Sequence, residues 1–416
     1  MSSLALAASV LLVLATAGKA SPVAAEDLRL SGFGTLGYSR DNRADLAATR
    51  DISQKPQGGY AAGPSWVMDS RLGAQLEYRL LTDVDLVGQV VLRDHFQASV
   101  DASIELAYLA VRPQSQTDIR LGRINYDAFL MSDHRNVGYA YTWVRPPLEF
   151  YGWIPIFSID GADAAYNIDT GDAHWRIKAQ AGRSKLSIPI GDGYDFRANN
   201  MLGLSLTRQT SLWRLKAAYS RFSIGSEVPA FAPAHAGLDQ VIAAAIPQVS
   251  AEAAMLRQKF SFKDARISYA TLGAVYDDGA WISQAELGKS TATADVVPSA
   301  SMAYASVGRR FGAWTPYLAL SASRPDRGSY SAAANWGAFN AALRDPVIFN
   351  LNTTRIDQET LTLGSRWDFH RQAALKLQWD GVTIKPSGYG LWWRNLAING
   401  QQSRVSQLSA TLDFVF

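Results

Sequence analysis

The sequence predicts an all-β fold, a transmembrane antiparallel β-barrel of about sixteen strands. Three observations predict it. Segments of about ten residues alternate between apolar and polar side chains. The connections between these segments alternate between short and long. Beyond the N-terminus, no apolar run reaches the length of about 18 residues that a spanning helix requires. Because backbone groups must be hydrogen-bonded internally in lipid, closed strands are then the remaining way to cross a membrane.

Composition narrows the class further. The chain has 416 residues, of which 48% are hydrophobic and 19% charged, and this mixture fits neither a disordered chain nor a helical membrane protein. The absence of cysteine excludes disulfides, thiolate metal sites and cysteine nucleophiles. A net charge of +3 without a cluster of Lys and Arg argues against nucleic acid as a partner. We expect no cofactor and no metal.

Residues 1–25 are expected to be a cleaved signal peptide, which leaves 26–416 as the barrel. Leu4 to Ala17 is apolar but too short to span a bilayer. The small residues Val23-Ala24-Ala25 precede a polar start at Glu26-Asp27, as a signal-peptidase site requires. The segment before Leu4 lacks Lys and Arg, which leaves the true start codon open. The alternative is a buried N-terminal helix.

Alternation sets the expected orientation of each strand. Between Arg71 and Leu80, apolar and polar side chains occupy opposite faces. In a membrane barrel the apolar face meets lipid and the polar face lines a wet lumen, since a dry core would not tolerate so many charges. Five residues are expected to face lipid: Leu72, Trp175, Leu215, Leu363 and Leu377. Five are expected to face the lumen: Arg71, Arg176, Lys216, Arg366 and Lys376. Aromatic residues near strand ends, such as Trp213 and Trp367, suit the membrane interfaces, although they could equally be core residues of a soluble β protein.

Seven short and eight long connections join sixteen strands. Short turns are expected near 81–83, 113–117, 169–172, 209–211, 277–279, 311–314 and 371–372. Long connections are expected at 41–63, 94–101, 125–158, 183–196, 223–256, 289–298, 324–356 and 383–403. Short turns on the periplasmic side and long loops outside are typical of membrane barrels, and the even strand number places both termini in the periplasm. Gly237 to Val249 and Ser331 to Arg344 could each hold a short helix.

The last strand, Arg404 to Phe416, ends at the C-terminus itself. Its apolar side chains alternate with polar ones and comprise Leu408, Ala410, Leu412, Phe414 and Phe416. This pattern resembles the signal read by the outer-membrane barrel-assembly machinery, which an exposed strand edge could engage by β-augmentation. The alternative is a soluble protein whose last strand merely ends in Phe.

Over nearly the whole mature length, the chain resembles the general porins of Gram-negative bacteria. The resemblance rests on Leu30-Ser31-Gly32-Phe33-Gly34-Thr35, on Leu121-Gly122-Arg123 and on Phe416. Pro147-Leu148-Glu149-Phe150-Tyr151-Gly152 is similar to the Pro-Glu-Phe-Gly-Gly turn of enteric porins, but the spacing differs by one residue and the second Gly is missing. The resemblance implies an outer-membrane homotrimer, in contact with lipid and lipopolysaccharide, whose third loop folds into the pore. Asn125 to Ser158 occupies the place of that loop.

Opposing charges across a narrow constriction would orient dipolar solutes. The expected constriction residues on the wall are Arg71, Arg93, Arg120, Arg176 and Lys178, and those on the third loop are Asp127, Asp133 and Glu149. Each could instead lie near a mouth of the pore. Lumen-side cations outnumber anions, which favours a weak preference for anions. The aromatic residues of the third loop could stack on a ring-bearing or sugar-like solute, or could pack the loop against the wall.

The function expected from these features is passive diffusion of small hydrophilic solutes and ions, without enzymatic activity. One alternative is a channel selective for anions such as phosphate, for sugars or for organic acids. Another is an outer-membrane hydrolase. The chain has five histidines and neither a His-Glu-x-x-His nor a Gly-x-Ser-x-Gly element. His174 and His370 fall on the lumen face, whereas a phospholipase-type barrel needs its His and Ser on the lipid side.

Overall fold

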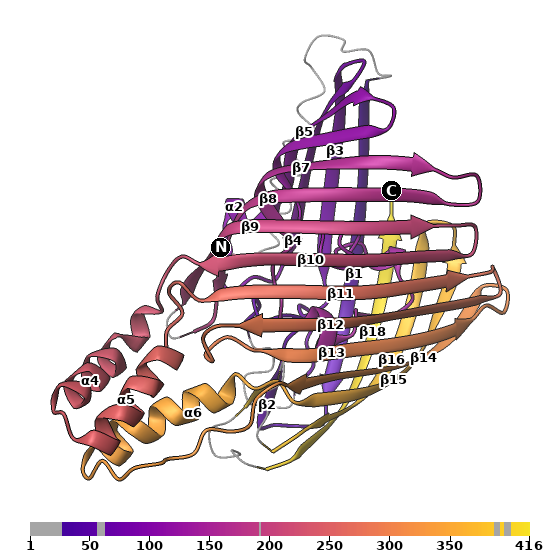
Figure 1. The fold of residues 1–416 in the computed structure, drawn as a ribbon. Coiled ribbons are helices and arrows are strands. Elements are labelled where there is room, and N and C mark those ends of the chain that lie inside the picture. Colours follow the sequence, from indigo (N-terminus) through magenta and orange to yellow (C-terminus); the bar gives the residue numbers. More distant parts are fainter. Residues whose placement is uncertain (1–26, 56–62, 191–192, 387–391, 395–400) are drawn as a thin grey trace.

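The computed structural model describes residues 27–55, 63–190, 193–386, 392–394 and 401–416. The expected signal peptide, residues 1–25, lies outside them. In the described part, sixteen strands close into one antiparallel barrel, in which β1 pairs with β18 (Figure 1). The strands are β1 (Leu28–Asp41), β3 (Arg71–Leu81), β4 (Val84–Arg93), β5 (Ile104–Gln114), β6 (Thr117–Asn125), β7 (Ser158–Asp169), β8 (His174–Ile188), β9 (Tyr194–Gln209), β10 (Trp213–Ile224), β11 (Arg266–Asp277), β12 (Trp281–Ala292), β13 (Ala300–Arg309), β14 (Trp314–Pro325), β15 (Gln358–His370), β16 (Ala373–Ile384) and β18 (Ser403–Val415). The predicted barrel is confirmed.

The alternation places side chains as predicted. Lys216, on the lumen face, is 8% exposed, and its neighbour Leu215 is 40% exposed on the outer face. Lys376 is fully buried, whereas Leu377 is 55% exposed. Residues that pair across neighbouring strands lie on the same face of the sheet. Lys216 pairs with Gly273, and Gly273 pairs with Glu286, so Lys216 and Glu286 both face the lumen. The polar face is therefore turned inward and the apolar face outward.

The short turns all lie at one end of the barrel, called here the turn end, and the long loops lie at the other, the loop end. Aromatic rings gather on the outer face at the turn end. Trp314 and Trp367 are paired residues of β14 and β15, and their rings stack with centroids 5.2 Å apart. Trp213, Trp281 and Phe369 are also exposed there. This belt is the arrangement expected at a membrane interface.

The loops are numbered in chain order: loop 1 (42–70), loop 2 (94–103), loop 3 (126–157), loop 4 (189–193), loop 5 (225–265), loop 6 (293–299), loop 7 (326–357) and loop 8 (385–402). Loop 4 is much shorter than the predicted 183–196. The prediction was wrong there because the hairpin of β8 and β9 extends outward, with Leu186 opposite Phe196 and Ile188 opposite Tyr194. Loop 2 ends in the short helix α2 (Val100–Ser103), and β2 (Leu46–Ala48) of loop 1 pairs with β17 (Trp392–Arg394) of loop 8.

Three helices project from the loop end (Figure 1). The helix predicted at Gly237 to Val249 is instead two, α4 (Ala232–Ala243) and α5 (Pro247–Lys259), because Ala245 adopts a φ of +55° and Pro247 starts a new helix. In loop 7, a π-helical turn η4 (Asn340–Arg344) leads into α6 (Asp345–Thr353), so the helix lies mainly after the predicted Ser331 to Arg344. No helix within the described ranges has the length and hydropathy needed to cross a membrane.

Barrel closure brings two glycines of β1 against two aromatic residues, Phe414 of β18 and Phe416 just after it. Gly34 lies opposite Phe414, and Gly32 exchanges two backbone hydrogen bonds of 2.8 and 2.9 Å with Phe416. A Cβ atom at either glycine would overlap the facing ring. The rings of Phe414 and Phe416 therefore cover the glycines on the outer face, an aromatic contact that fixes the register of the closing strands.

Candidate functional site: the lumen and loop 3

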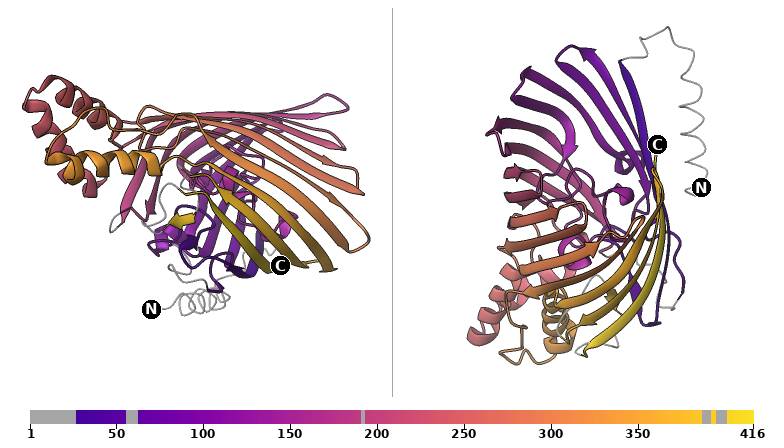
Figure 2. Two further views of the ribbon diagram at one scale, coloured as in Figure 1. Left: turned by 90° about the horizontal axis from the view of Figure 1, so that it is seen from below. Right: turned by 90° about the vertical axis from the view of Figure 1, so that its right-hand side faces the viewer.

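Loop 3 folds into the barrel and crosses to the opposite wall, as predicted (Figure 2). It contains a short 3-10 turn, η2 (Gly138–Ala140), and one helical turn, α3 (Leu148–Tyr151). The Gly138 carbonyl accepts a 2.7 Å hydrogen bond from Lys376 Nζ on β16, and the Val144 amide donates to Gln378 on the same strand. A Cβ atom at Gly138 would collide with Thr35, Arg71 and Asp413. Glycine is required there because the loop backbone lies directly on the wall.

The first attachment of loop 3 is an ion-pair cluster at its start. Asp127 contacts Lys178 at 3.0 Å and also Lys216, and it accepts a 2.7 Å hydrogen bond from Ser205. Burial would raise the pKa of Asp127, but the two ammonium groups outweigh it and hold the pKa well below its usual range. Asp127 and Lys178, both predicted for the constriction, therefore form a buried contact between loop and wall.

The second attachment joins the α3 turn to β12–β15. Glu149 is 1% exposed and accepts hydrogen bonds from Ser321, Gln358 and Thr360. On β12, Glu286 accepts from the Leu130 amide at 3.0 Å and from the Tyr151 hydroxyl. The carboxylate of Glu149 thus faces wall hydroxyl and amide groups rather than the predicted basic residues.

Arg145 makes the third attachment. Its guanidinium lies 2.6 Å from Asp69 of loop 1 and 3.2 Å from Asp380 of β16, and it donates to Gln407 and Ser409 of β18. Burial would raise the pKa of Asp69, but the charges of Arg145 and Arg50 lower it to about 2. Sequence reasoning missed Arg145. The signal was a lone cation between apolar residues and two prolines, in a loop already expected to fold inward.

The aromatic residues of loop 3 mostly pack the loop against the wall. Phe129 contacts Tyr151 and Tyr269 with ring centroids 5.2 and 5.3 Å apart, and Phe150 contacts Tyr304 at 5.3 Å. All five are at most 3% exposed. Of the two interpretations of this aromatic cluster, the contacts of these five favour packing.

A different surface of loop 3 faces the wall formed by β3–β6. Asp133 is exposed there and accepts a hydrogen bond from Asn125. Arg120 makes a bidentate contact with Asp163 and lies over the ring of Tyr108, 5.2 Å from its centroid. Lumen-facing Gln75, Glu77, Gln89 and Tyr108 are half-buried rather than sealed. Asp133 and Arg120 are thus predicted charges that lie near loop 3 and keep contact with solvent.

The other predicted wall cations bind different parts of the molecule, although Arg71 and Arg93 are paired residues of β3 and β4. Arg71 is buried against the Asn136 carbonyl and the Tyr141 hydroxyl of loop 3. Arg93 contacts Asp51 of loop 1 at 3.1 Å and stacks on Phe157. Arg176 lies close to the turn end, 2.7 Å from Asp118, and is not brought to loop 3. Whether any of the eight residues controls permeation stays a prediction.

Comparison with models of known protein families finds no match, and comparison with curated protein sequences finds none either. Solved structures do match. An anion-selective porin from Comamonas acidovorans aligns with a TM-score of 0.53 at 11% identity, over 94% of this chain and 100% of that one. Salmonella typhi OmpF, in complex with daunomycin, aligns with a TM-score of 0.51 at 12% identity, over 94% and 97%. OmpT of Vibrio cholerae gives 0.50 at 11%, over 94% and 98%. The chain therefore has the fold of the sixteen-stranded outer-membrane porins.

Proposed function

We propose that the protein is an outer-membrane channel for passive diffusion of small hydrophilic solutes and ions. The observation that carries the proposal is the asymmetric position of loop 3. The loop covers the lumen face of β12–β1, whereas Gln75, Glu77 and Gln89 on β3 and β4 keep contact with solvent. A polar wall beside a fixed loop supports a water-filled passage along β3–β6, past Asp133 and Arg120.

The charges beside this passage favour neither anions nor cations strongly. Arg120 is paired with Asp163 and Arg176 with Asp118, so neither cation adds a net charge. Asp133, whose described hydrogen bond comes from a neutral amide, brings negative charge to the passage. The weak anion preference expected from residue counts is therefore offset where the passage is narrowed by loop 3, and selectivity should depend on Asp133.

We also propose that the activity is not enzymatic, that residues 1–25 are the export signal and that the loop end faces outward. The strand ending in Phe416 would be the assembly signal, since Leu408 and Phe416 are 62% and 63% exposed on the outer face. A homotrimer remains a proposal drawn from the resemblance. Mass measurement of the unheated protein in detergent tests it directly, and a monomer mass would contradict it.

The test of the channel is single-channel recording in planar bilayers. A diffusion channel should give an ohmic conductance that rises in proportion to salt concentration and is unaffected by millimolar phosphate, sugar or organic acid. Saturable block by one of these solutes would replace the proposal with a substrate-selective channel. Absence of conductance in protein whose circular dichroism shows a folded barrel would refute both.

A further inference from the structure

We propose that the loop end contains a binding site for uncharged, hydrocarbon-rich molecules that carry rings. The site is a cavity of about 440 Å³ between loop 3 and the other loops, which lies within the range of about 300–1,000 Å³ typical of sites for small organic ligands. The proposal does not depend on the diffusion channel, since binding can occur whether or not the lumen conducts.

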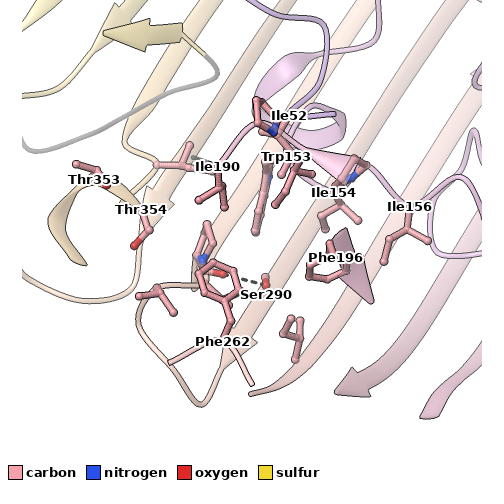
Figure 3. A pocket seen from close by; sticks show the side chains of 18 of the residues that line it. Ile52, Trp153, Ile154, Ile156, Ile190, Phe196, Phe262, Ser290, Thr353 and Thr354 are labelled. Carbon is pink, nitrogen blue, oxygen red and sulfur yellow. Dashed lines mark hydrogen bonds between the residues drawn. The ribbon is translucent and has the colours of Figure 1, made fainter. Parts of the chain in front are cut away.

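Seven of the eight loops contribute to this cavity. Loops 1, 3 and 4 supply Ile52, Ile154 and Ile190, loops 5 and 6 supply Phe262 and Val296, and loops 7 and 8 supply Thr353 and Trp392. Figure 3 shows several of these side chains around the shared space.

The chemistry of the lining selects the ligand. Among the described residues, the lining has no charged side chain and has many aromatic rings, including Trp153, Phe196 and Phe231. The polar side chains have their donors engaged within the protein, because Ser290 donates to the Pro298 carbonyl and Thr354 to the Asp295 and Leu351 carbonyls. A hydrophilic solute would lose its hydration there without replacement, whereas ring-bearing hydrocarbon surface would gain contacts with the aromatic side chains.

One hydrogen-bond donor of the lining has no acceptor among the described residues. The Nε1 of Trp392 is buried and has no hydrogen-bond partner among the described residues. Buried indole N–H groups usually have a partner, so a ligand with one ether, carbonyl or hydroxyl oxygen would suit this site better than a pure hydrocarbon.

The rim of the cavity is held by interlocked loops. Asp295 of loop 6 donates its backbone amide to Lys259 of loop 5, and its carbonyl accepts hydrogen bonds from Arg327 and Thr354 of loop 7. Glu252 of α5 accepts from the Ala333 and Ala334 amides and from the Trp336 indole. Loops 5, 6 and 7 are therefore joined to one another around the rim, so this side of the site is held in place before a ligand binds.

The experiment uses the full chain in lipid nanodiscs and N-phenyl-1-naphthylamine, an uncharged probe with three aromatic rings whose fluorescence rises in apolar surroundings. Empty nanodiscs provide the subtraction for partitioning into lipid. Ile154→Trp should fill the cavity and Ile52→Asp should place a charge in it, and each should weaken binding at least tenfold. Trp392→Phe should weaken binding of the oxygen-bearing analogue 1-naphthol about fivefold, the size of one hydrogen bond, without affecting the amine probe.

Matched controls are Leu204→Trp on the outer face, 61% exposed, and Ile246→Asp between α4 and α5, 55% exposed. Both should bind like the parent, one probe per chain and saturably. Signal no greater than that of empty nanodiscs, or binding unchanged in both cavity variants, would overturn the site. A glycerophospholipid or lipopolysaccharide seen in native mass spectra of the parent but not of Ile154→Trp would overturn the ring-bearing occupant. Conductance recorded on the same samples separates these outcomes from failure of the channel proposal.

Discussion

The two walls of the lumen carry the same alternating pattern but have different environments. On β16 and β18, lumen-facing Lys376, Thr411 and Asp413 are at most 1% exposed, because loop 3 lies on them. On β3 and β4, lumen-facing Gln75 and Gln89 keep contact with solvent. Strand periodicity decides which side chains point inward, whereas the path of one loop decides which of them meet water. The covered wall attaches loop 3, and in the proposed channel the open wall is the one along which solutes pass.

Removing the inward part of loop 3 should abolish the difference in solvent exposure between the two walls. Of the changes proposed here, it should alter conductance the most. Deletion of residues 131–151, bridged by glycine and serine, removes Arg145 and Glu149 and exposes the β12–β1 wall. Single-channel conductance should rise severalfold and larger solutes should enter, while the barrel still assembles because its strand pairing does not involve the loop. An unchanged conductance would show that loop 3 does not limit permeation.

Arg145→Leu should weaken the attachment of loop 3 to the covered wall. Asp380 would lose its cation while remaining buried, and removing one partner of a buried ion pair costs about 3 kcal/mol. The folded barrel should unfold at lower temperature in detergent gels, and current recordings should become noisier. The control, Arg123→Leu, removes contacts to Asp160 and Asp101 that are 43% and 72% exposed, and should cost less than about 1 kcal/mol. Equal losses of stability in the two variants would mean that the buried ion pairs of Arg145 contribute no more than the exposed ones of Arg123.

Acid should weaken the same attachment. The pKa of Asp69 is about 2 in the folded protein and near 3.8 ordinarily, so its contribution is complete above about pH 4 and is lost as the pH falls toward 2. The contribution is on the order of 2 kcal/mol. Thermal unfolding followed by circular dichroism at pH 6, 4 and 2.5 should show the loss in the parent. Asp69→Asn should be less stable at pH 6 and respond less to acid, and identical pH dependence in both would contradict the assignment.

The open wall is tested by charge reversal. Asp133→Lys should shift reversal potentials in a salt gradient toward anion permeation without changing thermal stability, since Asp133 is exposed. Asp172→Lys, a reversal at a short turn where Asp172 is 78% exposed, serves as the control and should shift the potential less. A larger shift at Asp172 would place the selective region at the turn end instead.

Much of the barrel follows from the sequence because two local signals repeat along it. Alternation fixed the orientation of residues such as Lys216 and Leu215, and turn chemistry located the short connections. The sequence did not predict that the hairpin of β8 and β9 continues into the expected loop 183–196. Ser184 to Ile188 gains strand structure only through pairing with Tyr194 to Ala198. The helical break at Ala245 was missed as well, since alanine alone does not signal a positive φ.

The site was less predictable than the fold. Asp127 was expected in the constriction and instead forms a buried ion pair, because loop 3 begins beside Lys178 on a nearby strand. Glu149 was expected to face arginines but meets Ser321, Gln358 and Thr360, since its position depends on how far the loop crosses the lumen. Arg145 and the apolar cavity could not be located, because both arise where loops distant in sequence converge.

Accessibility of single thiols tests the central claim most directly, and the chain contains no cysteine of its own. Gln89→Cys lies on the open wall and Thr411→Cys on the wall beneath loop 3. A water-soluble maleimide should label Gln89→Cys rapidly and Thr411→Cys slowly, and deletion of 131–151 should make the two rates similar. Equally rapid labelling of both variants with loop 3 intact would contradict the division of the lumen into a covered and an open wall.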